Sequence, residues 1–156
     1  MTKGAQDWDA PLVEAARAAM AHAHAPYSRF TVGAALRLST GEMISGANFE
    51  NASLGLSLCA ETVALASANA AGKLAQVIAI AVTGGPMEQP EGAASPAPIT
   101  PCGRCRQILA EAASLAGRDI RVYCAPVSGD GGATYGAAEL LPHAFSGADF
   151  SAAPQG

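Results

Sequence analysis

Three of the four cysteines in this 156-residue chain occur in patterns that suit metal binding. Cys59 is followed by Ala60 and Glu61, and Cys102 and Cys105 lie later in a Pro-Cys-Gly-Arg-Cys sequence. Both patterns fall where the sequence predicts a helix to begin, and residues i and i+3 share a helix face, so Cys102 and Cys105 can contact one ion. Backbone N–H groups and the helix dipole lower thiol pKa values there, which favours thiolate ligands.

Together with Cys59, these thiolates would leave a tetrahedral Zn²⁺ one open position for water, which is typical of catalytic rather than structural zinc. Glu61, two residues after Cys59, can lie beside this water without binding the metal. A carboxylate in that place can accept the proton of the water and pass it on. The pattern favours one catalytic Zn²⁺ per subunit, bound by Cys59, Cys102 and Cys105, with Glu61 as the acid–base residue.

Two other uses of the cysteines stay open at this point. Cys102 and Cys105 could form a thioredoxin-like redox pair, although no aromatic residue precedes Cys102 and the Cys-Ala-Glu sequence has no role in one. A closed structural zinc site would need Cys124 as its fourth ligand. Cys124 follows Val-Tyr and is more simply interpreted as a small buried strand residue.

The balance of charged and apolar residues narrows the classes of partner. The net charge is −4, with 50% hydrophobic and 14% charged residues. The chain is therefore expected to fold, and to bind neither nucleic acid nor an anionic membrane, since both need a clustered basic surface. It has no apolar run long enough to cross a membrane, and its first residues lack the apolar core of a signal peptide. We expect a cytoplasmic protein.

The elements that must position the cysteines follow from hydrophobic periodicity and from capping and turn residues. We expect a first helix between Asp9 and Pro26, then further helices over 59–71, 102–116 and 139–145. Strands are expected over 30–38, 43–48, 77–82, 120–124 and 133–137. Residues 1–8 are expected to form a loose tail, and 84–101 a long loop near the active site. This order, without repeat or linker, predicts a single domain over 1–156 with an α/β fold, a three-layer α/β/α sandwich around a mixed five-stranded sheet.

Beyond the cysteine patterns, further motifs run through most of the chain. In order, the motifs are Ala25-Pro-Tyr-Ser-Arg-Phe-Thr-Val-Gly-Ala-Ala-Leu36, Gly46-Ala-Asn-Phe-Glu-Asn-Ala-Ser53, Cys59-Ala-Glu61, Pro101-Cys-Gly-Arg-Cys-Arg-Gln107 and Glu139-Leu-Leu-Pro-His-Ala-Phe145. From about Ala25 to Phe150 the chain resembles the small homotetrameric cytidine deaminases. The resemblance implies zinc-dependent hydrolytic deamination of cytidine and 2′-deoxycytidine to uridine and 2′-deoxyuridine plus ammonia, in pyrimidine salvage.

The resemblance also implies roles for residues outside the cysteine cluster. Asn48 and Glu50 match positions that hydrogen-bond the ribose 3′-hydroxyl, and Phe30 matches an aromatic residue of the nucleoside pocket. The backbone of Ala60 would meet the pyrimidine edge. Phe145 matches a C-terminal aromatic residue that reaches into the site of a neighbouring subunit, which would make the homotetramer part of the active site.

Three departures from the family pattern affect these expectations. Thr62 stands where the family commonly has an Arg that balances the negative charge of the thiolates. We expect Arg104 or Arg106, which lie next to the ligands, to donate to a ligand sulfur instead. Leu54 replaces a frequent Tyr, so one polar contact between subunits is expected to be missing. The 84–101 loop is longer than its counterpart in the family and could alter the width of the pocket.

Two other functions stay open from the sequence. One is deamination of a modified cytosine nucleoside such as blasticidin S or an N4-substituted cytidine, because blasticidin S deaminase also has Cys-Gly-Arg-Cys-Arg-Gln and no Arg after Cys-Ala-Glu. Against it, the chain keeps Phe30, Asn48 and Glu50, the set expected for an ordinary ribonucleoside. The other is a non-catalytic zinc or redox module, which would not depend on Glu61.

Overall fold

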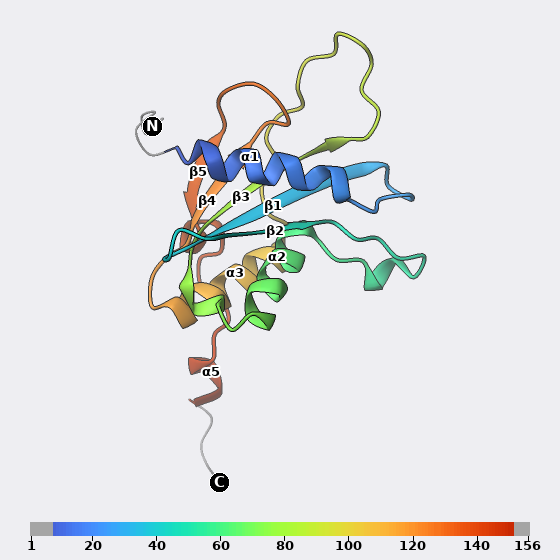
Figure 1. The fold of residues 1–156 in the computed structure, drawn as a ribbon. Coiled ribbons are helices and arrows are strands. Elements are labelled where there is room, and N and C mark those ends of the chain that lie inside the picture. The colour runs from blue at the N-terminus through green and yellow to red at the C-terminus, as the bar shows by residue number, and fades with distance from the viewer. Residues whose placement is uncertain (1–7, 152–156) are drawn as a thin grey trace.

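The computed structural model describes residues 8–151, and its centre is a mixed five-stranded sheet (Figure 1). The strands lie in the order β2-β1-β3-β4-β5. Their bounds are β1 Phe30–Leu38, β2 Met43–Ala47, β3 Val77–Pro86, β4 Arg121–Ala125 and β5 Ala133–Gly136. β3 and β4 pair in parallel, and the other neighbours pair antiparallel. The expected mixed sheet is confirmed.

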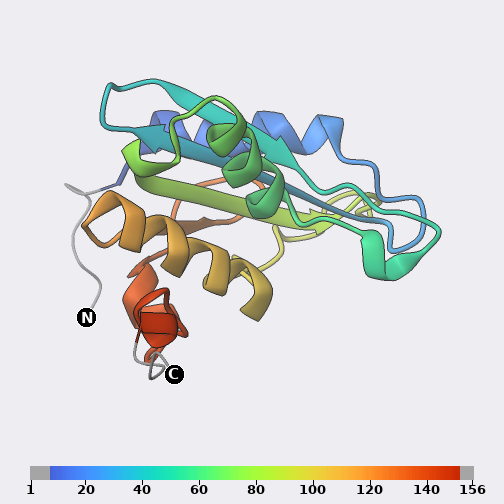
Figure 2. The ribbon, with the colours of Figure 1, turned by 90° about the horizontal axis from the view of Figure 1, so that it is seen from below.

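Helices cover both faces of this sheet. Figures 1 and 2 show α1 (Ala10–Ala19) on one face and α2 (Ala60–Ala70) with α3 (Gly103–Ala116) on the other. Because side chains alternate along a strand, the sheet separates two apolar clusters. The cluster under α1 contains Leu12, Val13, Ala16, Ala35, Ala81 and Tyr123, and the cluster under α2 and α3 contains Leu36, Leu65, Ile80, Val82, Leu109 and Val122. The expected three-layer sandwich is confirmed.

Small residues let the helices lie close against the strands. A Cβ on Gly33 of β1 would lie 2.0 Å from the carbonyl oxygen of Ala16 in α1. A Cβ on Gly46 of β2 would lie 2.6 Å from the carbonyl oxygen of Ala60 and from the amide nitrogen of Ala64, both in α2. The absence of a side chain at Gly46 therefore fixes how closely the first turn of α2 approaches the sheet.

Several element boundaries differ from the sequence-based expectations. β3 continues to Pro86 because its last residues pair with Phe30, Thr31 and Val32 of β1. The long loop therefore begins at Met87 rather than at Gly84. The helix expected over 139–145 is instead α4, over Ala137–Leu140. The short helices η3 Leu54–Leu56, η4 Leu74–Gln76 and α5 Ala148–Ser151 were not expected, whereas η2 Met20–His22 continues the first helix expected before Pro26.

Trp8 is the one residue of the expected N-terminal tail that lies within the described residues. Of the residues expected to form a loose tail, 1–7 lie outside the described residues, whereas the Trp8 ring packs edge-on against Tyr123 with 5.5 Å between centroids. Asp9 caps α1, as expected, by accepting a hydrogen bond from Leu12 N at 3.0 Å. Within 8–151, no helix combines the length and the hydrophobicity needed to cross a bilayer.

Candidate metal centre and active site

The three cysteines predicted to bind zinc converge from two helix N-termini. Cys59 is the N-cap residue of α2, Cys102 is the N-cap residue of α3, and Cys105 lies in the first turn of α3. Their Sγ atoms all lie within 4.8 Å of one another, and those of Cys59 and Cys102 are 3.7 Å apart. Residues far apart in the sequence therefore form one cluster of sulfur donors.

The chain path explains why the two helices begin side by side. α2 leads through η4 into the amino end of β3, so its own N-terminus lies toward the carboxyl end of that strand. α3 returns from the carboxyl end of β3 to the amino end of the parallel β4, on the same face of the sheet. Sites at the carboxyl ends of parallel strands are common in α/β proteins, because helix N-termini collect there.

The donor set fits one Zn²⁺ ion. Tetrahedral zinc with Zn–S bonds of about 2.3 Å keeps its sulfurs about 3.8 Å apart, close to the measured Cys59–Cys102 separation. Cys105 is buried, Cys59 partly buried and Cys102 exposed, so the cluster is open to solvent on one side. The hydrogen bond between Cys105 and Cys59 lowers the pKa of Cys59 to about 6 and raises the pKa of Cys105. Sulfurs packed this closely favour a cation among them.

Glu61 lies in the first turn of α2, two residues after Cys59. Its side chain is buried, with 4% of the residue exposed. Burial raises the pKa of its carboxyl group, and the neighbouring Cys59 thiolate raises it further. A carboxyl group with a raised pKa holds a proton more readily and so can both accept and donate one, which is what an acid–base residue beside a metal must do.

Thr62 makes a contact that the sequence analysis did not anticipate. Its Oγ1 lies 3.6 Å from Cys105 Sγ, so the residue that replaces the usual Arg touches a ligand itself. Thr62 is three residues after Cys59 and therefore on the same helix face. This three-residue spacing was the feature of the sequence that could have predicted a position of Thr62 beside the cysteine cluster.

In the described structure, the hydrogen bonds that Arg104 and Arg106 donate go to oxygen atoms. Arg104 Nη1 donates to Ser57 O at 3.3 Å, and the Arg104 charge contributes to the lowered pKa of Cys59. Arg106 donates from Nε to Pro101 O at 2.7 Å and from Nη1 to Leu140 O at 3.0 Å. Arg104 thus acts on the cysteine cluster through the electrostatic attraction of its positive charge for the Cys59 thiolate. Arg106 connects the residue before Cys102 to the end of α4 by hydrogen bonds.

The residues expected to bind the ribose, Asn48 and Glu50, lie in a segment that is hydrogen-bonded to the start of β1 and to the turn before it. Asn48 Oδ1 accepts from Val32 N, and Asn48 Nδ2 donates to Phe30 O, both at 2.9 Å. Glu50 Oε2 accepts from the amide nitrogens of Tyr27 and Ser28 at 2.9 and 3.2 Å. These interactions bring Phe30 and Asn48 together and fix Glu50 against the turn that precedes them.

Ala60 and Phe145 lie at opposite extremes of burial. Ala60 is fully buried at the start of α2, directly between Cys59 and Glu61. Phe145 is 58% exposed, packs edge-on against Phe150 at 5.3 Å between centroids, and accepts a hydrogen bond at its carbonyl from Gln107 of α3. Its ring is therefore directed to solvent in the single chain.

Comparisons with known proteins agree with this site. The family model described as the cytidine and deoxycytidylate deaminase zinc-binding region matches residues 6–117. The chain is 43% identical over 140 residues to a cytidine deaminase of Halalkalibacterium halodurans, covering 90% of this chain and 96% of that protein. It is 40% identical over 105 residues to a cytidine deaminase of Mycobacterium tuberculosis, covering 67% of this chain and 71% of that protein.

Solved structures give the same result. The crystal structure of a cytidine deaminase from Burkholderia pseudomallei superposes with a TM-score of 0.74 at 44% identity, covering 88% of this chain and 99% of that one. A cytidine deaminase from Mycobacterium leprae superposes with a TM-score of 0.65 at 34% identity, covering 88% and 98%. Because the matched zinc-binding region contains Glu61 and all three converging cysteines, the chain belongs to the cytidine and deoxycytidylate deaminase family.

Proposed function

We propose that this protein hydrolyses cytidine and 2′-deoxycytidine to uridine and 2′-deoxyuridine with release of ammonia, in pyrimidine salvage. The observation that carries the proposal is the convergence of three sulfurs beside the buried carboxyl group of Glu61. Relatives named cytidine deaminase, similar over most of the chain, support the choice of substrate.

The chemistry divides between the cysteines and Glu61. Cys59, Cys102 and Cys105 would hold Zn²⁺, which when bound supplies a Lewis acid that makes water nucleophilic near neutral pH. Glu61 accepts one proton from the attacking water and delivers it to ring N3 of the cytosine, then takes the second proton from the new C4 hydroxyl and passes it to the departing amine. Water thereby replaces the amine at C4, and the products are uridine and ammonia.

The substrate contacts follow from which atoms are already engaged. Asn48 uses Oδ1 and one Nδ2 proton for the backbone of β1, and the second Nδ2 proton can donate to a ribose hydroxyl. Glu50 accepts the amides of Tyr27 and Ser28 at Oε2, and a carboxylate has further acceptor positions with which it can accept from the same sugar. Phe30 would pack against the nucleoside, and the backbone of Ala60 would meet the pyrimidine edge.

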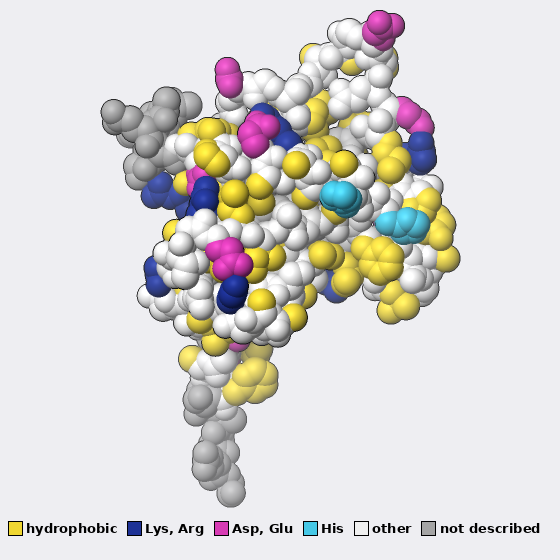
Figure 3. All heavy atoms as spheres, in the orientation of Figure 1, with side chains coloured by type: hydrophobic (Ala, Val, Ile, Leu, Met, Phe, Trp, Pro, Cys, Tyr) yellow, Lys and Arg dark blue, Asp and Glu magenta, His cyan; other side chains and the backbone are white. Residues whose placement is uncertain are grey.

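We further propose a homotetramer in which Phe145 enters a neighbouring site. Large apolar side chains are exposed at both ends of the molecule, with Phe49, Leu54 and Leu56 at one end and Phe145 and Phe150 at the other. Figure 3 shows hydrophobic side chains gathered at the first of these ends. Exposed apolar groups of this kind favour an interface between copies.

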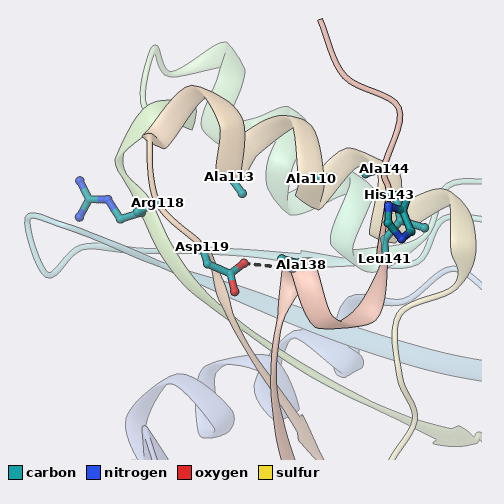
Figure 4. A pocket seen from close by; sticks show the side chains of 8 residues that line it. All are labelled: Ala110, Ala113, Arg118, Asp119, Ala138, Leu141, His143 and Ala144. Carbon is teal, nitrogen blue, oxygen red and sulfur yellow. Dashed lines mark hydrogen bonds between the residues drawn. The ribbon is translucent and has the colours of Figure 1, made fainter. Parts of the chain in front are cut away.

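A hollow beside the second end supports the same proposal. This open hollow has a volume of about 350 Å³, lies between α3 and the C-terminal segment, and is lined largely by Ala110, Ala113, Ala138, Leu141 and Ala144. Figure 4 shows Asp119 turned toward Ala138, whose amide nitrogen donates to Asp119 Oδ1 at 3.1 Å, and Arg118 directed away from the hollow. Apart from Arg118, Asp119 and His143 the lining is apolar, so this hollow suits apolar side chains of another copy.

We also propose that the protein works in the cytoplasm. Within the described residues all four cysteines are free thiols, and zinc binding by Cys59, Cys102 and Cys105 requires them to stay reduced. Fractionation of the source cells should place the activity with cytoplasmic markers.

The substrate proposal is tested by offering the zinc-loaded protein a panel of nucleosides. Cytidine and 2′-deoxycytidine should be converted to uridine and 2′-deoxyuridine with release of equimolar ammonia. The loss of cytidine ultraviolet absorbance measures the rate of this conversion. Deoxycytidylate, blasticidin S and an N4-substituted cytidine are the comparison substrates. Turnover of one of these together with none of cytidine would overturn the proposal in favour of a different cytosine compound.

A further inference from the structure

The contact between Thr62 and Cys105 joins the two helices across the metal centre. Thr62 lies in the first turn of α2 and Cys105 in the first turn of α3, with 3.6 Å between Oγ1 and Sγ. Cys105 is fully buried, so water does not solvate its sulfur. A metal-bound cysteine is a thiolate with no proton to give, so the hydroxyl of Thr62 is the donor in this pair.

The alternative use of a hydroxyl inside a helix is seen elsewhere in α2. Ser67 Oγ donates to Val63 O at 2.8 Å, the usual bond back to the carbonyl four residues earlier. For Thr62 that carbonyl is Leu58 O, which already accepts from Phe49 N at 2.9 Å. The hydroxyl of Thr62 contacts the sulfur of Cys105 instead. Because the side chain is β-branched, few other rotamers are available in which this contact would be broken.

The buried sulfur needs such a donor. An unsolvated thiolate without a hydrogen bond carries a large desolvation cost. The guanidinium groups of Arg104 and Arg106 are engaged with Ser57 O, Pro101 O and Leu140 O in the described structure. Thr62 is thus the residue whose hydroxyl group donates a hydrogen bond to the Cys105 sulfur.

We propose that Thr62 is a positioning residue of the metal centre, whose hydroxyl donates to the Cys105 thiolate, fixes its orientation and withdraws electron density from the sulfur. The proposal rests on the cysteine cluster as the metal site and is independent of which nucleoside is the substrate. Hydrogen bonds to metal ligands commonly change metal affinity by about 10- to 100-fold. Thr62 therefore sets how tightly the metal is held.

The test compares Thr62→Val, which removes the hydroxyl at nearly constant shape, with Thr62→Ser, which keeps it. Thr83→Val is the matched control, because Thr83 is a buried threonine of β3 whose hydroxyl has no partner among the described residues. Each protein is loaded with Co²⁺, whose absorption includes bands for electron transfer from thiolate to metal. Each zinc form is also challenged with a chelator, and the rate of zinc loss is measured.

For Thr62→Val we expect the thiolate-to-Co²⁺ bands at lower energy, because the sulfur becomes more electron-rich, and zinc loss to the chelator faster by about 10-fold or more. Thr62→Ser should restore both values, and Thr83→Val should match the wild type. Unchanged bands and zinc retention in Thr62→Val, or a Thr62→Ser protein that behaves like Thr62→Val, would overturn the proposal. Thr62→Ala, read in the same way, replaces Thr62→Val if the valine variant does not fold.

Discussion

Phe49 and Leu58 exchange two backbone hydrogen bonds, Phe49 N to Leu58 O at 2.9 Å and Leu58 N to Phe49 O at 2.8 Å. Phe49 stands between Asn48 and Glu50, and Leu58 immediately precedes Cys59. This bridge, together with the hydrogen bond from Asn51 N to Ser57 Oγ at 3.1 Å, holds the segment proposed to bind ribose against the segment that begins the metal centre. A substrate held by the first is thereby presented to the second at a fixed distance, which is how positioning contributes to catalysis.

Gly46 should be necessary for the correct placement of α2. In Gly46→Ala the new Cβ would meet Ala60 O and Ala64 N at 2.6 Å, so the first turn of α2 must move away from β2. We expect a loss of about 1–3 kcal/mol in the free energy of unfolding, measured with urea, together with a lower zinc content. Gly55→Ala is the control, since its Cβ would meet nothing within 4 Å. Equal stability and zinc content in the two variants would contradict this account of α2.

Arg106 should contribute to stability more than an ordinary surface arginine. Its guanidinium group bonds Pro101 O, Leu140 O and Thr100 Oγ1, and so joins the residues before Cys102 to the end of α4. Arg106→Gln should lower the free energy of unfolding by about 1–3 kcal/mol, because partly buried carbonyl groups lose their donors. Arg118→Gln, which removes one 3.5 Å contact on the surface, is the control and should be nearly neutral. Urea denaturation of both variants decides between these roles.

The Asp9–Arg37 pair should make stability depend on pH in acid. Arg37 donates to both carboxylate oxygens of Asp9 at 2.9 and 2.7 Å, and these hydrogen bonds hold the pKa of Asp9 below its ordinary value of 3.8. The stabilisation is therefore fully present above that ordinary value and is lost as the pH falls through the pKa of the folded state.

Asp9→Asn removes the charge while keeping a side chain that can cap α1. We expect it to lower the free energy of unfolding by about 1 kcal/mol at neutral pH and by progressively less in acid, where the wild-type carboxylate is also neutral. Urea denaturation across the acid range measures the difference. A difference that stays constant down to the lowest pH would show that the charge of Asp9 is not the cause.

Phe145 and Glu61 should complement each other between subunits. Co-expression of Phe145→Ala with Glu61→Gln gives mixed oligomers in which a Glu61 site can receive Phe145 from its neighbour. Activity in the mixture should exceed the sum of the two variants expressed separately. Size-exclusion chromatography with light scattering checks that both variants form tetramers. Strictly additive activity in mixed tetramers would contradict a role for Phe145 across subunits.

Local patterns in the sequence were sufficient to predict the metal centre. The i, i+3 spacing of Cys102 and Cys105 is a short-range feature that places these two ligands together, whereas the approach of Cys59 requires α2 to pack beside α3 and was inferred from the Cys-Ala-Glu pattern. The extension of β3 to Pro86 could not be predicted in this way, because Gly84 and Gly85 have low strand propensity and are held in the sheet by pairing with β1.

Contacts between distant residues explain what else was missed. Nothing in the sequence indicated that Arg106 also donates to Leu140 O, because Leu140 lies on a helix whose position depends on the tertiary fold. Asn48 was assigned to the substrate from resemblance, and its two bonds to the backbone around Phe30 and Val32 emerge only when β1 and β2 pair. The contact of Thr62 with Cys105 requires the packing of α2 against α3.

The most direct test of the account measures cytidine turnover and zinc content together in the wild type, Glu61→Gln and the control Glu111→Gln, an exposed residue of α3. All three proteins should hold one zinc ion per chain. We predict wild-type turnover for Glu111→Gln and a loss of about 10²- to 10⁴-fold for Glu61→Gln, because only the latter removes the group that carries the proton. A zinc-loaded Glu61→Gln protein with wild-type turnover would contradict the mechanism.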